Sequence, residues 1–476
     1  MTSQLLTTTQ AAVQVSATAL VEALQAIADA GIRWGHTAPE TPQRILIEYV
    51  SADPNGPLLL NHARGGVLGD TLSALLTFAG HTVSREFYVN DATNSRQLDR
   101  FARVLLHRYR SLLFEAGIFD GDLPPLATQD YPEAYVTEIA RKMIERDGDR
   151  FLSLSEDDAL NTVKQTAWEI VGTEQRERLE LLGLRFDNWF SEAQLHERGA
   201  VQQTLNRLRE AGYAYEKSGA LWLRSTAFGE TSDHTLMRPD GSPTYLAGDL
   251  AYHADKFERG YDRLIDVWNT DHAIYVERTR AGLAALGYDP ARLTVLLHAP
   301  VRLLKNGTEV RGTRLSGPDG SATLGETLPD LPASALRLLL LSRPAGEPVD
   351  VNADVVNRRD RSNPAAFLQD TLRRAISEAG KAATVRDIPD NSPEQLKAEL
   401  APLVEELTAF PQVVHTAAAE GTPDRLLTYA LSVAERWNRV DAAGNSFPLL
   451  ARAVTITLTN TLDILGVSHA SEMPAE

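Results

Sequence analysis

Residues 45–64 read Ile-Leu-Ile-Glu-Tyr-Val-Ser-Ala-Asp-Pro-Asn-Gly-Pro-Leu-Leu-Leu-Asn-His-Ala-Arg: a short apolar strand pattern, a Gly-Pro turn and a helix start. Apolar residues then recur at helical spacing, until Gly80 supplies a stop signal, at Val67, Leu68, Leu72, Leu75 and Leu76. The exposed N–H groups of a helix start, together with the imidazole of His62, can bind phosphate. The segment therefore predicts a βα unit that holds a nucleotide.

Strand and helix patterns alternate from about residue 44, which favours an α/β fold with a parallel sheet. We expect the sheet to continue through Thr82 to Val89 and to return near Leu264 to Trp268, after a more helical, charged insertion at about 130–220. From about residue 360 the pattern is helical and predicts a bundle, with a loop at Val385 to Ser392. Its apolar stripes end at Gly466 and consist of Leu426, Ala430, Val433 and Ala434, then Val454, Leu458, Leu462 and Leu465.

The composition is that of a large globular protein. The chain has 476 residues, 43% of them hydrophobic, and a mean hydropathy of -0.23, so we expect two or three domains. It has no cysteine, which excludes disulfides, thiolate metal sites and cysteine nucleophiles. Neither a signal peptide nor a membrane-spanning segment is recognisable, so cytoplasmic residence without a membrane partner is expected.

The charge balance is acidic, with 47 Lys and Arg against 64 Asp and Glu, or -17 in total. This excess disfavours indiscriminate binding to nucleic acid, which depends on the neutralisation of phosphates. A nucleic acid partner would need a local basic surface, and residues 358–381 are the best candidate. Taken alone, that stretch reads as a solvated helix face of mixed charge.

Carboxylates gather at the predicted carboxyl end of the first strand. Glu48 and Asp53 lie there, where open α/β sheets bind ligands. Tyr245 and Asp249 stand four residues apart and share a face if their segment is helical. Carboxylates in one pocket favour a cation, and a planar guanidinium matches a carboxylate in bidentate geometry. Taken singly, each residue reads as a surface charge or a helix cap.

These motifs together resemble the arginyl-tRNA synthetases, a class I aminoacyl-tRNA synthetase family. In that family the turn reads Gly-Pro-Leu-His-x-Gly-His-Ala-Arg, whereas here Leu59 replaces the first histidine and Asn61 the glycine. The pocket carboxylates match its Glu-x-x-Ser-x-Asn-Pro strand end and Tyr-x-x-x-Asp helix, with Asp53 in place of the asparagine. Further matches run in order along the chain at 87–91, 184–192, 219–229, 249–256, 268–272 and 463–466.

The resemblance implies a Rossmann-like class I catalytic domain at 44–355, followed by an all-α helical-bundle anticodon-binding domain at 356–476. Residues 1–43 are then a short N-terminal extension, too small for the family's tRNA-elbow domain, although Ala19 to Ala30 looks helical. The implied activity is arginine-tRNA ligation. The implied partners are arginine, ATP with Mg²⁺ and tRNA, and a monomer is expected.

The resemblance also implies roles for individual residues of this chain. The implied arginine-binding residues are Glu48, Asp53, Tyr245 and Asp249, and the implied ATP-binding residues are Asn61, His62, Asp271, His272 and Lys305. The implied catalytic residues are His62, Arg311 and Arg314. The implied tRNA-binding residues are Arg358, Arg359, Arg361, Arg373 and Arg374. Without the resemblance, Asp271-His272 reads as a helix cap with a satisfied histidine. Asp53 would repel triphosphate unless it pairs with the substrate ammonium group or stays protonated.

The second nucleotide signature of the family, Lys-Met-Ser-Lys, is altered at residues 305–314. Thr313 takes the position of the second lysine, or Arg314 does if the alignment moves by one residue. Gly56 occupies the position before the first signature where some relatives carry a substitute lysine. Arg311, Arg314 or Lys305 would have to act instead, and arginine does not replace lysine neutrally at a tight phosphate site. A catalytically degenerate paralogue that binds tRNA, arginine or a protein partner is therefore the alternative function.

Overall fold

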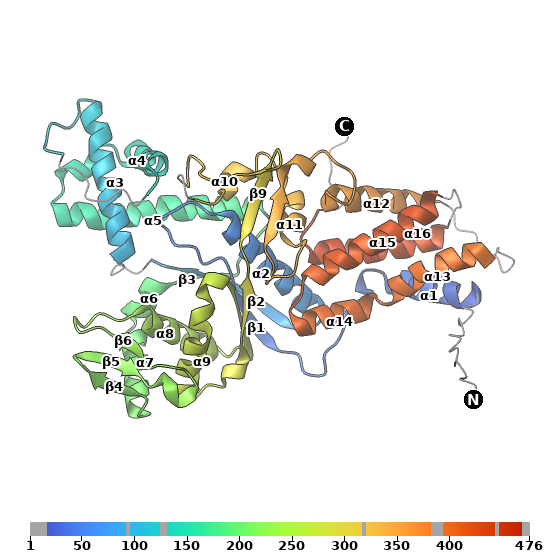
Figure 1. Ribbon diagram of the computed structural model, residues 1–476, viewed down its shortest axis with the longest axis horizontal. Helices are drawn as coiled ribbons and strands as arrows, with labels where there is room; N and C mark the ends of the chain where they lie inside the picture. Colours follow the sequence, from blue (N-terminus) through green and yellow to red (C-terminus); the bar gives the residue numbers. More distant parts are fainter. Residues whose placement is uncertain are drawn as a thin grey trace, which may run out of the picture.

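A five-stranded parallel sheet lies at the centre of the computed structural model, which describes residues 17–91, 96–123, 131–316, 320–381, 394–442 and 447–468 (Figure 1). The strand order is β3-β2-β1-β7-β8, and every neighbouring pair is parallel. Their bounds are β1 (Arg44–Glu48), β2 (Thr82–Val89), β3 (Asn188–Ser191), β7 (Arg263–Asn269) and β8 (Leu293–His298). The expected α/β class with a parallel sheet is confirmed.

The first βα unit has the predicted form. Helix α2 (Leu60–Phe78) follows β1 after the Gly-Pro turn, and its predicted apolar positions are all buried. The chain then turns at Gly80, whose φ of +91° suits glycine because it has no Cβ to clash. Thr82 to Val89 forms β2 with the expected bounds.

The connection from β2 to β3 is a helical unit with its own apolar core. It consists of α3 (Arg96–Glu115), α4 (Glu133–Asp147) and α5 (Glu156–Leu181), which stand apart from the sheet in Figure 1. The helical part thus begins earlier than the expected 130–220. That expected stretch also contributes β3 to the sheet, because a four-residue strand with polar ends leaves little apolar signal in the sequence.

The next two connections cover the other side of the sheet. The chain from β3 to β7 contains α6 (Glu192–Glu197), α7 (Ala200–Glu210) and α8 (Tyr245–Glu258), and the chain from β7 to β8 contains η4 (Thr270–Tyr275) and α9 (Val276–Ala285). Between α7 and α8 the chain forms a small antiparallel sheet of β4 (Ala214–Lys217), β5 (Ala220–Leu223) and β6 (His234–Met237). In Figure 1 these elements lie below the sheet, opposite α5.

The segment after β8 carries the second signature. Strands β9 (Val301–Lys305), β10 (Thr308–Glu309) and β11 (Val349–Asn352) form a three-stranded sheet. Helices α10 (Leu324–Thr327) and α11 (Ala333–Leu340) lie between β10 and β11 in sequence. Leu315, in the signature loop, packs against the core of the α3–α5 unit. The loop is thus held between the sheet domain and the helical unit.

The C-terminal part is a helical bundle, as expected. It comprises α12 (Pro364–Ala379), α13 (Glu394–Thr408), α14 (Phe410–Glu420), α15 (Asp424–Ala442) and α16 (Pro448–Ile464). The predicted apolar stripes of α15 and α16 are buried, and Gly466 ends the last one with a φ of +67°. The loop expected at Val385 to Ser392 lies outside the described residues.

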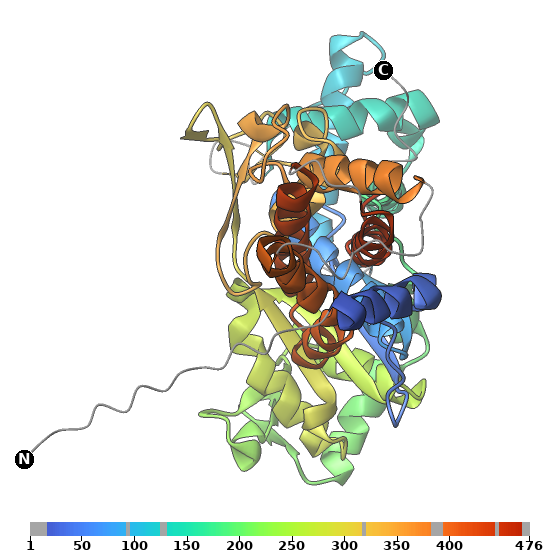
Figure 2. The same cartoon turned by 90° about the vertical axis from the view of Figure 1, so that its right-hand side faces the viewer.

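The N-terminal helix belongs to this bundle in space. Helix α1 (Ala17–Ala30) lies along α13 and α16, on the right of Figure 1 and at the front of Figure 2. Asn460 donates hydrogen bonds to the carbonyl oxygens of Ile32 and Trp34, and Trp34 donates to that of Leu407. Residues before β1 therefore help to fix the bundle.

No helix among the described residues is long and apolar enough to cross a membrane.

Candidate functional site

Three carboxylates lie side by side across the central strands. Glu48 is paired in register with Glu86 on one side and with Asp266 on the other, so all three project to the same face. Helix α8 supplies the cations. Lys256 donates to Glu48 (2.6 Å) and Asp266 (2.8 Å), and Arg259 makes a bidentate pair with Glu86 (2.6 and 2.8 Å).

The buried charges fix the protonation of this layer. Burial raises the pKa of Glu48, and the adjacent Lys256 opposes that rise. Burial alone would raise the pKa of Asp266, but Lys256 and His253 outweigh this effect and lower the pKa of Asp266 to about 2. His253 donates to Asp266 over 2.6 Å. The layer is therefore an internal salt-bridge network that orients α8 against the strand ends.

Glu48 belongs to this network as well as to the predicted arginine pocket. Its second oxygen accepts a hydrogen bond from Ser51 (2.8 Å), and the residue is only 8% exposed. Lys256 already neutralises its charge. Direct contact between Glu48 and a substrate guanidinium stays a prediction, but the geometry favours an indirect role in holding α8 in place.

A less neutralised cluster of carboxylates, called the acidic pocket below, surrounds Tyr88 at the ends of β2 and β3. Burial raises the pKa of the Tyr88 hydroxyl, and four nearby carboxylates raise it further: Glu192, Asp249, Glu48 and Asp91. Glu192 is the first residue of α6, and its Oε1 lies 3.7 Å from where a side chain on Gly248 of α8 would begin. The sequence prediction omitted Glu192, although it directly follows a strand in the quoted match at 184–192.

Asp249 faces this pocket from α8. Burial acts to raise its pKa, but the charged His253 and a hydrogen bond from Thr279 (2.8 Å) lower it, so it remains a carboxylate. Tyr245, one turn earlier on α8, is 72% exposed. The structure therefore places Asp249 with the other acids, and Tyr245 at the surface of the same helix face.

Asp53 lies on the turn between β1 and α2. Its oxygens accept hydrogen bonds from Asn90 (2.6 Å) and Gln97 (3.1 Å), two neutral donors. Burial raises the pKa of Asp53, and these two hydrogen bonds oppose the rise. Glu192 also raises it through space. Asp53 thus connects the acidic pocket with the cavity at the start of α2.

His62 is positioned as a hydrogen-bond donor at the start of α2. Its Nδ1 accepts the backbone N–H of Leu59 over 3.0 Å, and burial lowers its pKa to about 4. The neutral ring therefore carries its proton on Nε2. Asn61 turns its Oδ1 to the backbone N–H of Val301 (2.8 Å), so its side chain is held by β9.

A cavity of about 280 Å³ opens beside His62. It is lined by Asp53, Asn55, Gly56, Pro57, Leu59, His62, Tyr131, Pro132, Tyr135, Leu315, Ser316 and Gly320, none of which is Lys or Arg. The hydroxyl of Tyr135 is buried and has no hydrogen-bond partner among the described residues. This tyrosine was not predicted from the sequence, and it offers a neutral donor at the cavity.

The three predicted surrogate cations are each paired with an acid. Lys305 donates to Asp330 (2.6 Å), Arg311 to Glu309 (2.7 Å) and Arg314 to Glu138 (3.4 Å). Thr313 shares a 2.7 Å hydrogen bond with Ser316 and accepts the backbone N–H of Ser316, which closes a local turn. Among the residues that the structure describes, the cavity beside His62 therefore has no Lys or Arg in its wall.

The predicted adenosine-binding pair lies in η4, after β7. Asp271 and His272 are exposed, and the amide oxygen of Asn269 accepts the backbone N–H of Asp271 (3.2 Å). Asn269 thus caps the short helix. His272 is an electrostatic neighbour of both Asp53 and the buried His298, so η4 lies near the β1–α2 turn.

The predicted tRNA-binding arginines lie just before α12 (Arg358, Arg359 and Arg361) and in its second half (Arg373 and Arg374). Acidic neighbours pair with four of them: Asp370 with Arg359 and Arg373, Glu435 with Arg361, and Asp441 with Arg374. Arg358 is exposed. This surface is of mixed charge, and tRNA binding by these residues stays a prediction.

No group of three or more His, Asp or Glu side chains arranged to hold a metal ion occurs among the described residues.

Comparisons with known proteins agree on one family. A profile described as tRNA synthetases class I (R), catalytic domain, matches residues 24–315. The arginine–tRNA ligase of Syntrophotalea carbinolica is 35% identical over 459 residues, covering 93% of this chain and 81% of the relative. A Campylobacter jejuni structure provisionally described as an arginyl-tRNA synthetase aligns with a TM-score of 0.83 and 26% identity, over 96% of this chain and all of that one. The Thermus thermophilus arginyl-tRNA synthetase, at 20% identity, shares the fold with a TM-score of 0.70, over 93% of this chain and 85% of that one.

Proposed function

The chain belongs to the arginyl-tRNA synthetase family, and from this premise we propose that it ligates arginine to tRNA. In the first step the arginine carboxylate attacks the α-phosphate of ATP, which gives arginyl-adenylate and releases pyrophosphate. In the second step a hydroxyl of the tRNA 3′ end attacks the activated carbonyl and AMP leaves. Both steps are carried by positioning and charge stabilisation, without a protein nucleophile.

The acidic pocket around Tyr88 is the observation that carries this proposal. Glu192 and Asp249 act on Tyr88, and Asp53 interacts with Glu192. Asp53 is bound by the neutral Asn90 and Gln97, Asp249 by His253 and Thr279, and Glu192 lies 3.6 Å from His196. Arginine brings two cationic groups, a guanidinium and an ammonium. We assign the guanidinium to Glu192 and Asp249, because a carboxylate matches its planar fork, and the ammonium to Asp53.

ATP is assigned to the cavity beside His62. Nε2 of the neutral imidazole donates to a phosphate oxygen, and the buried Tyr135 hydroxyl is a second donor within the same wall. Asp271 and His272 approach from η4 and are assigned to the adenosine portion. Mg²⁺ enters with the triphosphate, since magnesium is usually held by substrate phosphates and water.

The proposed domain division follows the predicted bounds. We assign catalysis to residues 44–355 and tRNA recognition to the bundle at 356–476. Since α1 packs on α13 and α16, residues 17–30 go with the bundle in space. The proposal for the arginines around α12 requires tRNA phosphates to compete with Asp370, Glu435 and Asp441 for them.

The lack of Lys and Arg in the described cavity wall favours a second candidate function, a degenerate synthetase that binds without efficient catalysis. A developing phosphate charge needs preorganised donors, and one such donor is typically worth about 10²- to 10³-fold in rate. Leu59 and Thr313 occupy the positions where the resemblance places two such donors. Lys305, Arg311 and Arg314 are each paired with an acidic side chain. On this basis we propose slow ligation rather than the rate of an ordinary synthetase.

Arginine-dependent exchange of pyrophosphate into ATP, with and without tRNA, tests the two candidates. Measurable exchange followed by arginine transfer to tRNA supports the ligase. Tight arginine binding without exchange under either condition supports the binding protein. Absence of both exchange and arginine binding would contradict the assignment of the acidic pocket.

A further inference from the structure

A second cavity, of about 190 Å³, lies on the opposite face of the sheet from the acidic pocket. Successive residues of β2 and β3 alternate between the two faces. Tyr88 and Phe190 contact Tyr252 of α8, whereas their neighbours Phe87 and Trp189 line the second cavity beneath α5. The cavity therefore belongs to neither the proposed arginine pocket nor the cavity beside His62.

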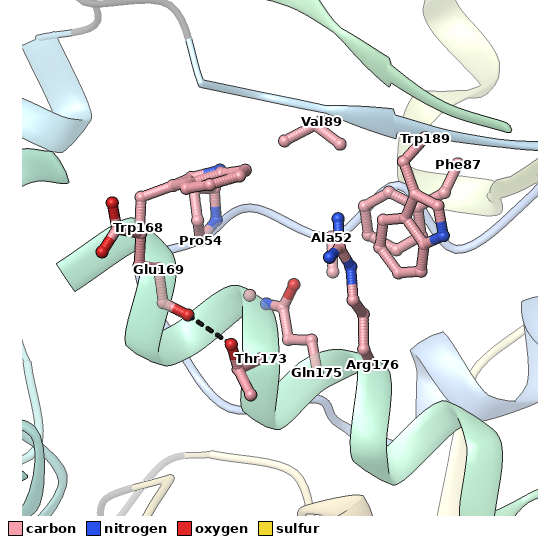
Figure 3. A pocket seen from close by; sticks show the side chains of 11 residues that line it. Ala52, Pro54, Phe87, Val89, Trp168, Glu169, Thr173, Gln175, Arg176 and Trp189 are labelled. Atoms are coloured by element: carbon pink, nitrogen blue, oxygen red, sulfur yellow. Dashed lines mark hydrogen bonds between the residues drawn. The ribbon is translucent and has the colours of Figure 1, made fainter. Parts of the chain in front are cut away.

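Its walls are aromatic. Figure 3 shows Trp168 above Pro54 at one end and Trp189 with Arg176 at the other, with Val89 above and Gln175 below. Trp189 stacks on Phe87 with ring centroids 4.4 Å apart. The volume is below the ~300–1,000 Å³ of pockets that enclose whole drug-sized molecules, so a single flat ring system suits it better.

The cavity also has an available positive charge. The guanidinium of Arg176 lies 4.4 Å from the centroid of the Trp189 ring, and no carboxylate pairs with it among the described residues. The one acid of the wall, Glu169, is bound by Arg146 over 2.7 Å. A flat ring that carries an anionic group is thus the complementary ligand, and a nucleotide has that chemistry. Aromatic and guanidinium planes are common stacking partners of unpaired bases.

The position of the cavity indicates which nucleotide occupies it. Ala52 and Pro54 line this cavity, whereas Asp53, between them, lines the cavity beside His62, so the two share one turn as a wall. Gln175 of α5 donates to the carbonyl oxygens of Asp53 and Gly56 in that turn (3.0 and 3.4 Å). An RNA whose terminal nucleotide reacts at the carboxyl ends of the β-strands would reach this cavity with one of its neighbouring nucleotides.

We propose that this cavity holds an unpaired base of the tRNA 3′ end, stacked on Trp168 at one end, with a backbone phosphate on the Arg176 guanidinium at the other. The proposal rests on the proposed function, because it takes tRNA as the substrate. The bound base holds the 3′ end beside the 53–56 turn. Gln175 connects this turn to α5, the helix that contacts the base. A free mononucleotide would offer the same chemistry and is distinguished by the test.

The test compares two RNAs on the whole protein: a tRNA for arginine and the same tRNA without its 3′-terminal CCA. Equilibrium binding is measured for the wild type, Trp168→Ala and Arg176→Gln. Stacking on one aromatic residue corresponds to about 5- to 150-fold in affinity. We expect each variant to lose a factor in this range on the intact tRNA and to bind the trimmed tRNA as the wild type does.

Matched controls are available in the β4–β6 sheet. Trp222 is half-buried like Trp168, and Arg224 is exposed and lies over Tyr215 as Arg176 lies over Trp189. Trp222→Ala and Arg224→Gln should leave both affinities unchanged. Trp168→Phe, which keeps a ring, should retain most of the binding and shows that any loss in Trp168→Ala is not a folding defect.

Two results would overturn the proposal. One is equal loss on intact and trimmed tRNA, which would make Arg176 part of a general phosphate surface. The other is equal binding of both RNAs by the wild type together with Trp168-dependent binding of free CMP or AMP, which would assign the cavity to a mononucleotide. Failure of the ligase function is seen separately, as absent pyrophosphate exchange in a wild type that still distinguishes the two RNAs.

Discussion

Arg337 donates a 2.7 Å hydrogen bond to Asp70, and this buried ion pair joins α11 to α2. The same guanidinium donates to the carbonyl oxygens of Leu182, at the end of α5, and of Leu465, at the end of α16 (both 3.1 Å). Three segments far apart in sequence therefore meet at one side chain: the helix that carries His62, the helical unit and the C-terminal bundle.

Removing this arginine should strongly destabilise the protein. Breaking a buried ion pair by truncating one partner typically costs about 3–5 kcal/mol, because the other charge is left without compensation. We expect Arg337→Met to lower the free energy of unfolding, measured with urea, by about that amount, reduced somewhat by Arg85, which lies 3.7 Å from Asp70. Arg302→Met breaks the exposed pair with Asp350 and should cost about 1 kcal/mol or less. Equal effects would contradict the junction role.

The fold was predictable where local signals agree with the tertiary structure. The strand, turn and helix around His62, and the stop at Gly80, each follow from periodicity and from glycine's tolerance of positive φ. Strand β3 was hidden because four residues carry too little pattern. The packing of α1 on the bundle was equally hidden, since a contact between residues 400 positions apart leaves no local signal.

The chemistry of the site was only partly predictable. The sequence identified carboxylates at the strand ends, but not that Lys256, more than 200 residues from Glu48, neutralises one of them. That pairing depends on strand register and on the orientation of α8. Likewise, Arg373 looks like a cation for tRNA in the sequence, whereas in the structure it donates to Asp370 one turn earlier on α12.

Glu192 should contribute strongly to arginine binding. Removing one partner of a desolvated, hydrogen-bonded charge pair costs about 2–5 kcal/mol, so we expect Glu192→Gln to weaken arginine affinity by about 30-fold or more. Glu197→Gln, on the exposed side of the same helix, is the matched control and should change nothing. Isothermal titration with arginine measures both. An unchanged affinity in Glu192→Gln would remove this residue from the pocket.

The buried His253 should make stability depend on alkaline pH. Burial alone lowers its pKa, but Asp249 and Asp266 raise the pKa of His253 to about 10, against about 6.5 in an unfolded chain. The charged ring thus stabilises fully below about pH 6.5, and this contribution is lost as the pH rises towards 10. Urea unfolding at pH 6, 8 and 10 should show the deficit of His253→Gln shrinking with pH. The exposed His415→Gln should show no such trend, and a constant deficit in His253→Gln would argue against a charged ring.

The Tyr135 hydroxyl should act on ATP and not on arginine. It is buried without a partner among the described residues, in the wall of the cavity beside His62. Tyr135→Phe keeps the ring packed and removes only the donor, so stability should stay the same or rise slightly. We expect the rate of pyrophosphate exchange to fall about 10- to 100-fold while arginine affinity is unchanged. Tyr109→Phe removes a hydroxyl that donates to Gly148 in the same helical unit and should leave exchange unaltered.

The altered second signature should be repairable if the missing positive charge limits the rate. Thr313 lies in the loop that borders the cavity beside His62, whose described wall carries no Lys or Arg. A lysine there would place a charge-assisted donor beside the transferring phosphates, and we expect Thr313→Lys to raise the exchange rate about 10²-fold or more without changing arginine affinity. Thr308→Lys adds the same charge on the exposed β10 and should have no effect. If Leu59→His combined with Thr313→Lys gives no increase either, the lost donors are not what limits this protein. If the wild type already exchanges at the rate of an ordinary synthetase, a wall without Lys or Arg among its described residues is no handicap, and neutral donors such as His62 and Tyr135 suffice.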